Sequence, residues 1–284
     1  MAAAAPLANA VSSAGVLSGK FPHGTPIEWM QGPLIGKGSF ARVYYGVNLK
    51  SKEIMAVKQV DKPMRERMVD ALHQEIALLE DLQHDNIVRY LGFEAGEKTI
   101  NVFLEYVSGG SASSLLAKCG RFDEPLCCNL VEQILSGLEY LHERCIIHRD
   151  IKGANILIDE DGVVKISDFG ISKKNEYKMA YRYNSRMSLQ GSVYWMAPEV
   201  IKSKGYSAKV DIWSLGCVVL EMLTGTHPWR QLDEMQTMWR LGRGNAPEIP
   251  DDLSDLAKDF LAQCLTVDAE QRPTASQLLM HPWI

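Results

Sequence analysis

The sequence predicts an α+β protein of two lobes, a small β-rich lobe followed by a larger, mainly helical lobe. Strand patterns come first: residues 28–36, 41–49 and 53–60 alternate between apolar and polar side chains and are separated by turn residues. Helical spacing of apolar residues dominates after about residue 107. Strands grouped in one part of a chain and helices in the next indicate the α+β class.

The remaining predicted elements complete both lobes. One helix is expected inside the β-rich lobe, where four apolar residues share one helical face. They are Met68, Leu72, Ile76 and Leu79. Two further strands are expected around residues 87–93 and 101–106. In the second lobe a stripe of apolar residues predicts a long helix: Val131, Ile134, Leu138 and Leu141.

The N-terminal residues are rich in Ala, Ser and Gly. A signal peptide is not expected, because no Lys or Arg precedes Lys20 and Pro6 interrupts the apolar run. We therefore expect a flexible segment over residues 1–26, an N-lobe over 27–107 and a C-lobe over 108–284. A ligand is expected in the cleft between the lobes.

Composition argues against several kinds of partner. The net charge is -5 and no basic block occurs, so neither a nucleic acid nor a membrane is expected as partner. The longest apolar stretch, residues 210–225, is too short to span a membrane and contains Asp211 and Glu221. None of the six cysteines forms a C-x-x-C pair, which favours reduced thiols that fill the core of a cytoplasmic protein.

Two glycines fall between the first two predicted strands, in "IGKGSFARV". Glycine there lets the backbone approach an anion closely and point N–H groups at it. Glycine-containing hairpins are common, however, so Gly36 and Gly38 alone are a weak signal. Strand alternation places Lys58 on one face with Ala56, behind this hairpin. A lone lysine in a strand is usually a solvated edge residue, and that interpretation stays open.

Glu75 is an acidic residue on the apolar face of the predicted helix. It lies seven residues after Met68 and four before Leu79. A carboxylate on such a face needs a cationic partner, and Lys58 is the natural one. A glutamate at the edge of the apolar stripe that reaches solvent explains the pattern equally well.

The stretch "IIHRDIKGANILID", residues 146–159, sets polar side chains between two apolar runs. Because buried unpaired charges are costly, a loop at a cleft is the better interpretation. Asp168 follows another apolar strand, in "VVKISDFG". Asp150, Asn155 and Asp168 offer oxygen ligands that suit Mg²⁺, and Asp150 is also a candidate base. Taken singly, an Asp or Asn in a turn is more often a turn former.

These stretches belong to a set of motifs that resembles the eukaryotic protein kinases over about residues 29–284. The motifs follow in the family's order: "GKGSFARV", "AVK", an acid in the next helix, "HRDIKGAN", "DFG", "APE", "DIWSLG" and a late Arg272. Each motif alone is weak, but their order and spacing leave little room for chance. The resemblance implies the bilobal protein-kinase fold, with one key helix in the small lobe. Lys152, two residues after Asp150, matches the serine/threonine form.

The resemblance implies catalytic and metal-binding roles for the matching residues. Asp150 is expected to accept the proton of the substrate hydroxyl, and Lys152 to contact the γ-phosphate. Lys58 is expected to hold the α- and β-phosphates, with Glu75 orienting it. The implied Mg²⁺ ligands are Asn155 and Asp168.

The resemblance also implies an ATP site. Its residues are Ile35, Gly36, Lys37, Gly38, Ser39, Phe40, Ala41, Val43, Ala56, Lys58, Leu104, Glu105, Val107, Ser111 and Leu157. Leu104 stands at the gatekeeper position, Glu105 and Val107 are expected to bond adenine through their backbones, and Ser111 should lie near the ribose. Ala41 departs from the family pattern, which has a third glycine there, and we expect a modest effect on nucleotide affinity.

Two structural networks are implied as well. The first is a stacked hydrophobic spine held by Asp211, and its members are Leu79, Tyr90, His148 and Phe169. The second is a buried ion pair in the C-lobe between Glu199 and Arg272.

Less specific stretches, such as "GSVYWMAPEVI" and "RPTASQLLMHPWI", resemble the corresponding motifs of fungal MAP kinase kinase kinases. That resemblance implies a serine/threonine kinase that uses ATP and Mg²⁺ to phosphorylate a MAP kinase kinase on its activation loop. Two alternatives are a catalytically weak pseudokinase scaffold in a signalling cascade, and a small-molecule phosphotransferase with a similar core. The presence of Lys58, Asp150, Asn155 and Asp168 disfavours the pseudokinase.

A regulatory phosphorylation site is expected in the loop after Asp168. In the family, an arginine placed like Arg149 pairs with a phosphate on this loop, and Lys173 matches a second cationic position. Ser188 is at the expected spacing, and Ser185 is the second candidate. The phosphate would come from an upstream kinase or from a second copy in trans. The alternative is that Ser188 is only an exposed loop serine.

Overall fold

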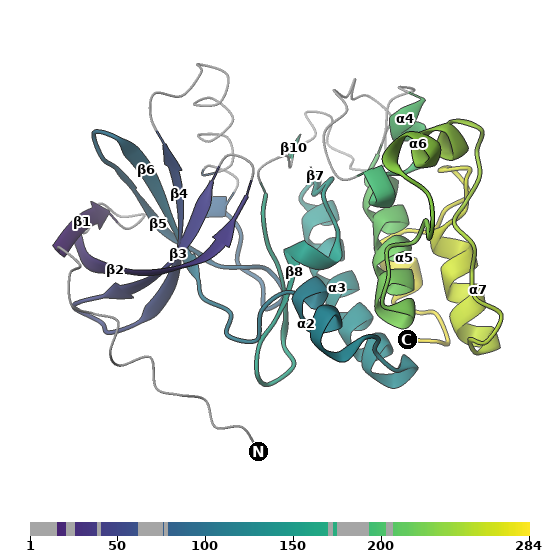
Figure 1. Ribbon diagram of the computed structural model, residues 1–284, viewed down its shortest axis with the longest axis horizontal. Helices are drawn as coiled ribbons and strands as arrows, with labels where there is room; N and C mark the ends of the chain where they lie inside the picture. Colours follow the sequence, from purple (N-terminus) through teal and green to yellow (C-terminus); the bar gives the residue numbers. More distant parts are fainter. Residues whose placement is uncertain are drawn as a thin grey trace. The chain divides into compact units, whose positions relative to one another are not determined.

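The computed structural model describes residues 16–20, 26–38, 41–61, 76, 79–169, 173–174, 193–202 and 207–284. The chain forms two compact units, which are considered separately (Figure 1). Unit 1 comprises residues 1–83 and 88–107, and unit 2 comprises residues 84–87 and 108–284. The predicted α+β class is confirmed, because the described strands of unit 1 form one sheet whereas unit 2 is mainly helical.

Unit 1 is built from one antiparallel sheet that closes on itself. Its strands follow the order β1-β2-β3-β4-β6-β5, and the β1–β5 contact pairs Lys20 with Phe93. Their bounds are Val16–Lys20 (β1), Pro26–Lys37 (β2), Arg42–Asn48 (β3), Ile54–Asp61 (β4), Tyr90–Ala95 (β5) and Thr99–Glu105 (β6). The three strands predicted first correspond to β2, β3 and β4.

Strand β1 lies inside the segment that the sequence suggested to be flexible. It pairs antiparallel with β2, from Val16 opposite Met30 to Lys20 opposite Pro26. These five residues are strand in the structure, and the flexibility expected for residues 1–26 stays a prediction. Because β2 supplies the hydrogen-bonding edge, the strand does not depend on a strong apolar pattern of its own. Residues 1–15 and 21–25 lie outside the described residues.

One face of the sheet carries the core of unit 1. Ile27, Trp29, Met55, Val57 and Phe103 form one buried cluster, in which Trp29 and Phe103 meet edge to face with ring centroids 5.3 Å apart. Truncating a buried aromatic such as Trp29 to Ala would cost about 3–5 kcal/mol. Burial alternates along β4, so every second residue of that strand points away from this cluster.

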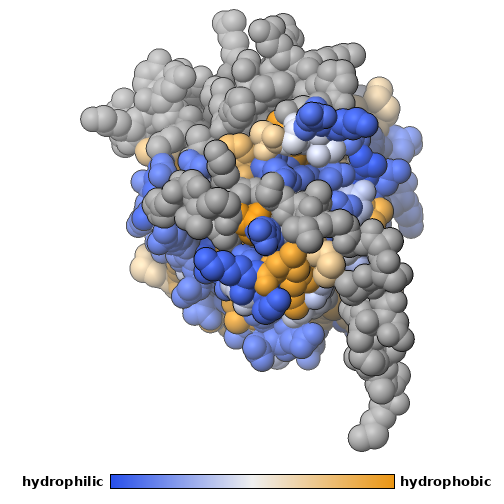
Figure 2. Space-filling model, turned by 90° about the vertical axis from the view of Figure 1, so that its left-hand side faces the viewer, coloured by the Kyte–Doolittle hydropathy of each residue, from blue (hydrophilic) through white to orange (hydrophobic). Residues whose placement is uncertain are grey.

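Of the helix predicted around residues 68–79, only Ile76 and Leu79 are described, and both are helical and buried. Glu75 lies outside the described residues. On the face of the molecule that Figure 2 shows, the described residues are mostly hydrophilic, and hydrophobic residues form a few small areas. The exposed large apolar residues of unit 1 are Leu34, Ile35 and Ile54.

Unit 2 is mainly helical. Its helices are α2 (Ala112–Cys119), α3 (Glu124–Glu143), α4 (Pro198–Ile201), α5 (Lys209–Thr224), α6 (Glu234–Gly242), α7 (Asp255–Cys264) and α8 (Ala275–Leu278). Two-stranded sheets pair β7 (Ile146–Ile147) with β10 (Lys173–Lys174) and β8 (Ile156–Ile158) with β9 (Val164–Ile166). Single 3₁₀ turns occur at η2 (Gly153–Asn155) and η3 (Val193–Trp195).

Helix α3 contains the predicted apolar stripe. Asp123 caps its N-terminus by accepting a hydrogen bond from the Leu126 backbone N–H at 3.0 Å. The stripe residues Val131, Ile134, Leu138 and Leu141 are all buried, as the spacing predicts.

Helix α5 forms the centre of unit 2, between α3 and α7 (Figure 1). Its residues from Val210 to Leu223 are all buried. At Gly216 a Cβ atom would approach Cys264 Cβ within 2.7 Å, so glycine permits the close approach of α7. Burial raises the pKa of the thiols of Cys217 and Cys264, which keeps them protonated packing groups. None of the described helices has the length and apolar character that a membrane crossing requires.

Candidate active site

In unit 1, one sheet face gathers the predicted nucleotide-binding side chains. Val43 on β3 lies opposite Lys58 on β4, and Ala56 lies opposite Leu104 on β6. Residues opposite each other, and residues two apart on one strand, share a face. The four residues therefore lie on the face that points away from the apolar core, and all four are half-buried.

The glycine hairpin begins on the same part of the sheet. Gly36 lies opposite Val43, and the Gly38 N–H donates to the Ala41 carbonyl at 2.8 Å, which closes the turn between β2 and β3. Lys37 is exposed and lies opposite Arg42. Ser39 and Phe40, which were also predicted to contact ATP, lie outside the described residues.

At the end of β6 the backbone of Glu105 is tied to the neighbouring strand segment. Its N–H donates to the Arg89 carbonyl at 2.9 Å, and its side-chain Oε2 accepts from the Arg89 N–H at 3.0 Å. Val107 follows as the last residue of unit 1.

In unit 2, the predicted ribose and adenine residues are neighbours. Ser111 and Leu157 form an isolated antiparallel bridge, and the Ile158 N–H donates to the Gly110 carbonyl at 2.9 Å. Ser111 also caps α2, because its Oγ accepts from the Ser114 N–H at 3.2 Å. The backbone contact needs a glycine at 109, where a Cβ atom would lie 2.2 Å from the Ile158 carbonyl oxygen.

The loop between β7 and β8 holds the predicted catalytic residues in one hydrogen-bonded set. Asp150 Oδ2 accepts from Lys152 Nζ at 2.7 Å and from Asn155 Nδ2 at 3.0 Å. Asn155 Nδ2 also donates to the Asp150 carbonyl at 2.8 Å. Only 13% of the Asp150 side chain is exposed, so these bonds fix the direction of its carboxylate.

The same set extends to the strand end that carries Asp168. The Asn155 carbonyl accepts from the Ser167 N–H at 2.9 Å and from Ser167 Oγ at 3.0 Å. Asp168 follows Ser167 and is exposed. The structure thus joins Asp150, Asn155 and the backbone beside Asp168 within unit 2.

Two residues of this site have left-handed backbones. Arg149 has φ of 71° and Asp168 has φ of 63°. For residues other than glycine this conformation costs of order 1–3 kcal/mol, and it persists only where the surroundings hold it.

Asp211 on α5 holds the backbone at Arg149. Its Oδ1 accepts from the Arg149 N–H at 2.8 Å, and its Oδ2 accepts from the His148 N–H at 2.9 Å and contacts His142 Nε2 at 2.8 Å. Burial by itself would raise the pKa of Asp211, but the hydrogen bond and charge of His142, the charge of His148 and the Arg149 N–H outweigh it and lower that pKa. A charged Asp211 therefore fixes the loop that precedes Asp150.

The part of the predicted spine that belongs to unit 2 is present. His148 and Phe169 are buried and meet edge to face, with ring centroids 5.0 Å apart. His148 Nε2 also contacts the Ser167 carbonyl at 3.0 Å. The other two spine residues, Leu79 and Tyr90, are buried in unit 1.

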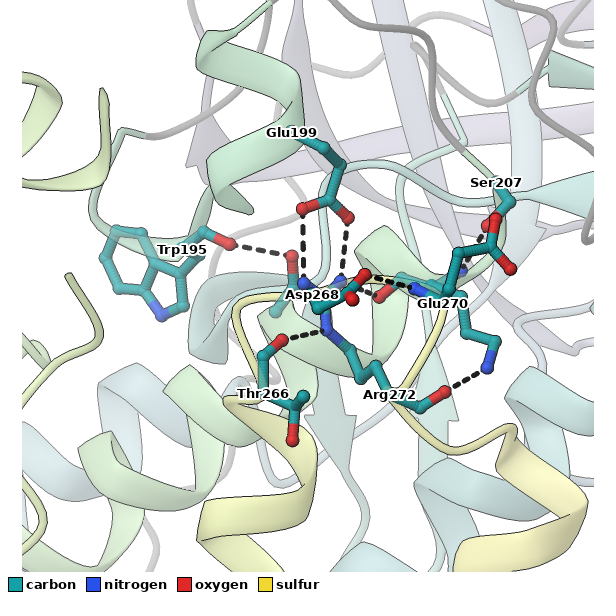
Figure 3. A network of polar contacts seen from close by, with 9 residues as sticks. Trp195, Glu199, Ser207, Thr266, Asp268, Glu270 and Arg272 are labelled. Atoms are coloured by element: carbon teal, nitrogen blue, oxygen red, sulfur yellow. Dashed lines mark hydrogen bonds and ion pairs between the residues drawn. The ribbon is translucent and has the colours of Figure 1, made fainter. Parts of the chain in front are cut away.

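The predicted ion pair between Glu199 and Arg272 is confirmed (Figure 3). Arg272 binds the Glu199 carboxylate through two nitrogens, at 2.7 and 3.1 Å, and also donates to the carbonyls of Thr266 and Lys209 at 3.0 and 2.6 Å. The arginine side chain is fully buried, so every one of these bonds forms away from solvent. Arg272 lies between α7 and α8, and because it also bonds the Lys209 carbonyl, it links Glu199 of α4 to the start of α5.

Sequence reasoning missed the role of Glu221. This residue of α5 accepts hydrogen bonds from Ser113 Oγ at 2.9 Å, from the Gly153 N–H at 3.3 Å and from Trp195 Nε1 at 3.0 Å. Its only signal in the sequence is that it is an acidic residue inside a long apolar run, a pattern that also argues against a membrane span. The regulatory candidates Ser185 and Ser188 lie outside the described residues.

Comparisons with known proteins agree with this geometry. A family model described as "Protein kinase domain" matches residues 29–284. The mitogen-activated protein kinase kinase kinase MST11 of Pyricularia oryzae is 50% identical over 272 residues, which is 90% of this chain and 30% of that protein. In Saccharomyces cerevisiae, the serine/threonine-protein kinase BCK1/SLK1/SSP31 is 50% identical over 268 residues, 90% of this chain and 18% of that protein.

A further relative from Saccharomyces cerevisiae, the serine/threonine-protein kinase STE11, is 44% identical over 303 residues. The match covers 92% of this chain and 42% of STE11, so the chain spans less than half the length of each of these relatives. The family model implies the use of ATP. The chain therefore belongs to the protein kinase family, on its serine/threonine side, and is closely related to fungal MAP kinase kinase kinases.

Proposed function

We propose that this chain is an ATP-dependent serine/threonine protein kinase that phosphorylates a MAP kinase kinase on a Ser or Thr of its activation loop. The observation that carries the proposal is the bonded set of Asp150, Lys152 and Asn155. A carboxylate held by a lysine and an amide beside a strained backbone is suited to receive a proton from a positioned hydroxyl.

Each unit, considered by itself, carries residues to which the family resemblance gives a role in ATP binding. The glycine hairpin and Lys58 of unit 1 are suited to the phosphates, because backbone N–H groups and a lysine both favour anions. Val43, Ala56 and Leu157 would provide apolar contacts to adenine. The Glu105 N–H already donates to Arg89, so we assign the Glu105 carbonyl as its adenine contact.

Asn155 and Asp168 have the donor chemistry for Mg²⁺, since both offer oxygen ligands. The amide nitrogen of Asn155 is bonded to Asp150, which leaves Oδ1 as the metal ligand. Bound there, Mg²⁺ would neutralise charge on the transferring phosphoryl group.

The protein's own part in the reaction is positioning. Lys152 and Asn155 both bond Asp150 Oδ2, so we assign Oδ1 as the atom that accepts the proton of the substrate hydroxyl. Lys152 would then contact the γ-phosphate as the hydroxyl oxygen approaches it. Holding the hydroxyl in line with the phosphorus lowers the barrier without a covalent intermediate.

The substrate class rests on the relatives. MST11 and the Schizosaccharomyces pombe protein mkh1 are both named MAP kinase kinase kinases, and mkh1 is 50% identical over 273 residues. These names state that the relatives act on a MAP kinase kinase, and we propose the same substrate class for this chain.

A phosphate-transfer assay tests the proposal. The chain is incubated with labelled ATP, Mg²⁺ and a panel of catalytically inactive MAP kinase kinases, and the labelled residues are mapped by mass spectrometry. We expect label on an activation-loop Ser or Thr of at least one member. The variants Lys58→Met and Asp168→Ala should stay folded and lose transfer, because they remove the proposed phosphate and Mg²⁺ contacts. Transfer to none of the panel nor to a generic basic protein would favour the pseudokinase scaffold.

We also propose that phosphorylation of Ser188, with Ser185 as the second candidate, raises activity. Support comes from Arg149 and from the backbone position of Lys173. Arg149 directly precedes Asp150, and the backbone of Lys173 pairs with Ile147, two residues before Arg149. A phosphate adds about -1.5 to -2 charge and three acceptor oxygens, enough to bind such cations.

Ser188→Ala should therefore lower activity by tenfold or more, roughly the effect of losing one charge-assisted contact of 1.4 kcal/mol or more. Ser185→Ala serves as the matched comparison. Mass spectrometry of the active enzyme should find phosphate at residue 188, placed there by an upstream kinase or by a second copy. Full activity of Ser188→Ala, with no phosphate at 188 in the wild type, would remove this residue from the mechanism.

A further inference from the structure

Glu221 is a buried carboxylate where three segments of unit 2 meet. Its side chain comes from the last turns of α5, and the residue is only 8% exposed. Oε1 accepts from Ser113 Oγ at 2.9 Å, and Oε2 accepts from the Gly153 N–H at 3.3 Å and from Trp195 Nε1 at 3.0 Å. All three donors are neutral groups, so the contact is directional and does not depend on a paired cation.

Each donor belongs to a segment with a separate task. Ser113 lies in α2, two residues after the cap residue Ser111. Gly153 directly follows Lys152 and begins the turn that leads to Asn155. Trp195 ends the η3 turn, three residues before α4 begins.

Trp195 is fastened to α5 at two points. Glu221 accepts from its indole N–H. The Trp195 carbonyl, whose bond is drawn in Figure 3, accepts from Ser214 Oγ at 2.8 Å. Glu221 and Ser214 are two turns apart on α5, so one rigid helix sets the position of this tryptophan.

Gly153 and Glu221 fit each other closely. A Cβ atom on Gly153 would lie 2.5 Å from Ser113 Oγ and 2.8 Å from Glu221 Oε1. Only a residue without a side chain lets the backbone N–H reach the carboxylate. The turn between Lys152 and Asn155 thus depends on both residues.

We infer that Glu221 is a positioning residue for phosphoryl transfer, which locks the loop of Asp150 and Lys152 to the segment that carries Trp195. The inference rests on the proposed kinase function, and Glu221 touches neither substrate nor nucleotide. Its loss would leave three donors without their acceptor and would let Asp150 and Lys152 shift. Because a misplacement of about 1 Å can cost about 100-fold in rate, the effect should appear in kcat.

Steady-state kinetics on Glu221 variants test this role. Glu221→Ala should lower kcat about 10- to 100-fold and change KM for ATP by less than about threefold. Glu221→Gln should keep kcat within about fivefold, since its amide oxygen can accept from Gly153 and Trp195 while its NH₂ donates to Ser113. The matched control is Glu139→Ala, a half-buried glutamate of α3, for which no change is expected.

A double-variant cycle separates positioning from general stability. Gly153→Ala should lower kcat about tenfold or more in the wild type, but by less than about threefold when Glu221→Ala is also present. The double variant lacks the carboxylate contact, and Ser113 Oγ, no longer bonded to Glu221, can rotate away from the new Cβ atom. If Glu221→Ala does not fold, Trp195→Phe provides the test. It removes the indole N–H and should lower kcat severalfold at unchanged KM for ATP.

The outcomes distinguish the two claims. If the wild type is active and a folded Glu221→Ala variant has the same kcat, the role of Glu221 is overturned and the kinase function stands. Additive effects of the two substitutions in the cycle would lead to the same conclusion. Where only Trp195→Phe folds, an unchanged kcat would overturn it equally. A folded wild-type protein without phosphate transfer would instead overturn the proposed function itself.

Discussion

A single buried carboxylate, Asp211, determines the backbone geometry beside the candidate base. It accepts the N–H groups of His148 and Arg149 and so holds Arg149 in a left-handed conformation that the residue would not adopt alone. The sequence indicated Asp150, Asn155 and Asp168, because each interrupts or ends an apolar run. It also showed Glu221 as an acid inside an apolar run, but it could not indicate the three donors of Glu221, which come from segments distant in the chain.

The lowered pKa of Asp211 makes stability depend on pH. Since the folded-state pKa lies below the ordinary value, its contribution is complete above about pH 4 and is lost as the pH falls through the lower folded value. Wild-type Tm should therefore exceed that of Asp211→Asn above pH 5, and the gap should narrow towards pH 2. Thermal melts from pH 7 to pH 2 measure it, with the exposed Asp251→Asn as control. A gap that does not change with pH would contradict the charged Asp211.

Leu104 should control access to the back of the proposed adenine site. It shares a sheet face with Ala56, Lys58 and Val43 and stands one residue before Glu105. Leu104→Gly removes a half-buried side chain and should admit ATP analogues that carry a bulky N6 group. Transfer from such an analogue should rise at least tenfold in the variant relative to wild type. Equal use by both proteins would show that Leu104 does not form that wall.

At the scale of elements, the sequence predicts best where a periodic pattern is complete. Strand β4 and helix α3 carry clear alternation and a clear apolar stripe, and both form where expected. Strand β1 was missed, because its pairing with β2 is a contact between segments and leaves little trace in its own composition. The short strands β7 and β10 are equally hard to predict, since each has only two residues.

The Glu199–Arg272 pair should stabilise the arrangement of α4 and α5. Arg272→Met leaves a buried carboxylate and two carbonyls without their donor, which should cost about 3–5 kcal/mol and lower Tm by roughly 10 °C. Arg42→Met is the matched control. It breaks the exposed pair with Asp61, whose side chains are 39% and 65% exposed, and should cost less than about 1 kcal/mol. Calorimetry measures both Tm values. A similar decrease in Tm for the two variants would contradict the idea that burial makes the Glu199–Arg272 pair stabilising.

At the scale of the whole molecule, the two units contribute different parts of the proposed chemistry. Unit 1 offers the glycine hairpin and Lys58, and unit 2 offers Asp150, Asn155 and Asp168. The order of the motifs along the chain allowed the family and its fold to be predicted from sequence. The hydrogen-bonded junction at Glu221 could not be, because it depends on distances that only the folded unit defines.

The proposed kinase function is best tested by measuring nucleotide binding and phosphate transfer on the same protein. Asp150→Asn should bind Mg·ATP within about threefold of the wild-type Kd, because Asp150 is assigned to the substrate hydroxyl. The same variant should lose at least about 100-fold in transfer to an inactive MAP kinase kinase, as expected for removal of a general base. Calorimetry gives the first quantity and labelled ATP the second. If a folded Asp150→Asn variant transfers phosphate at the wild-type rate, this carboxylate does not serve as the base.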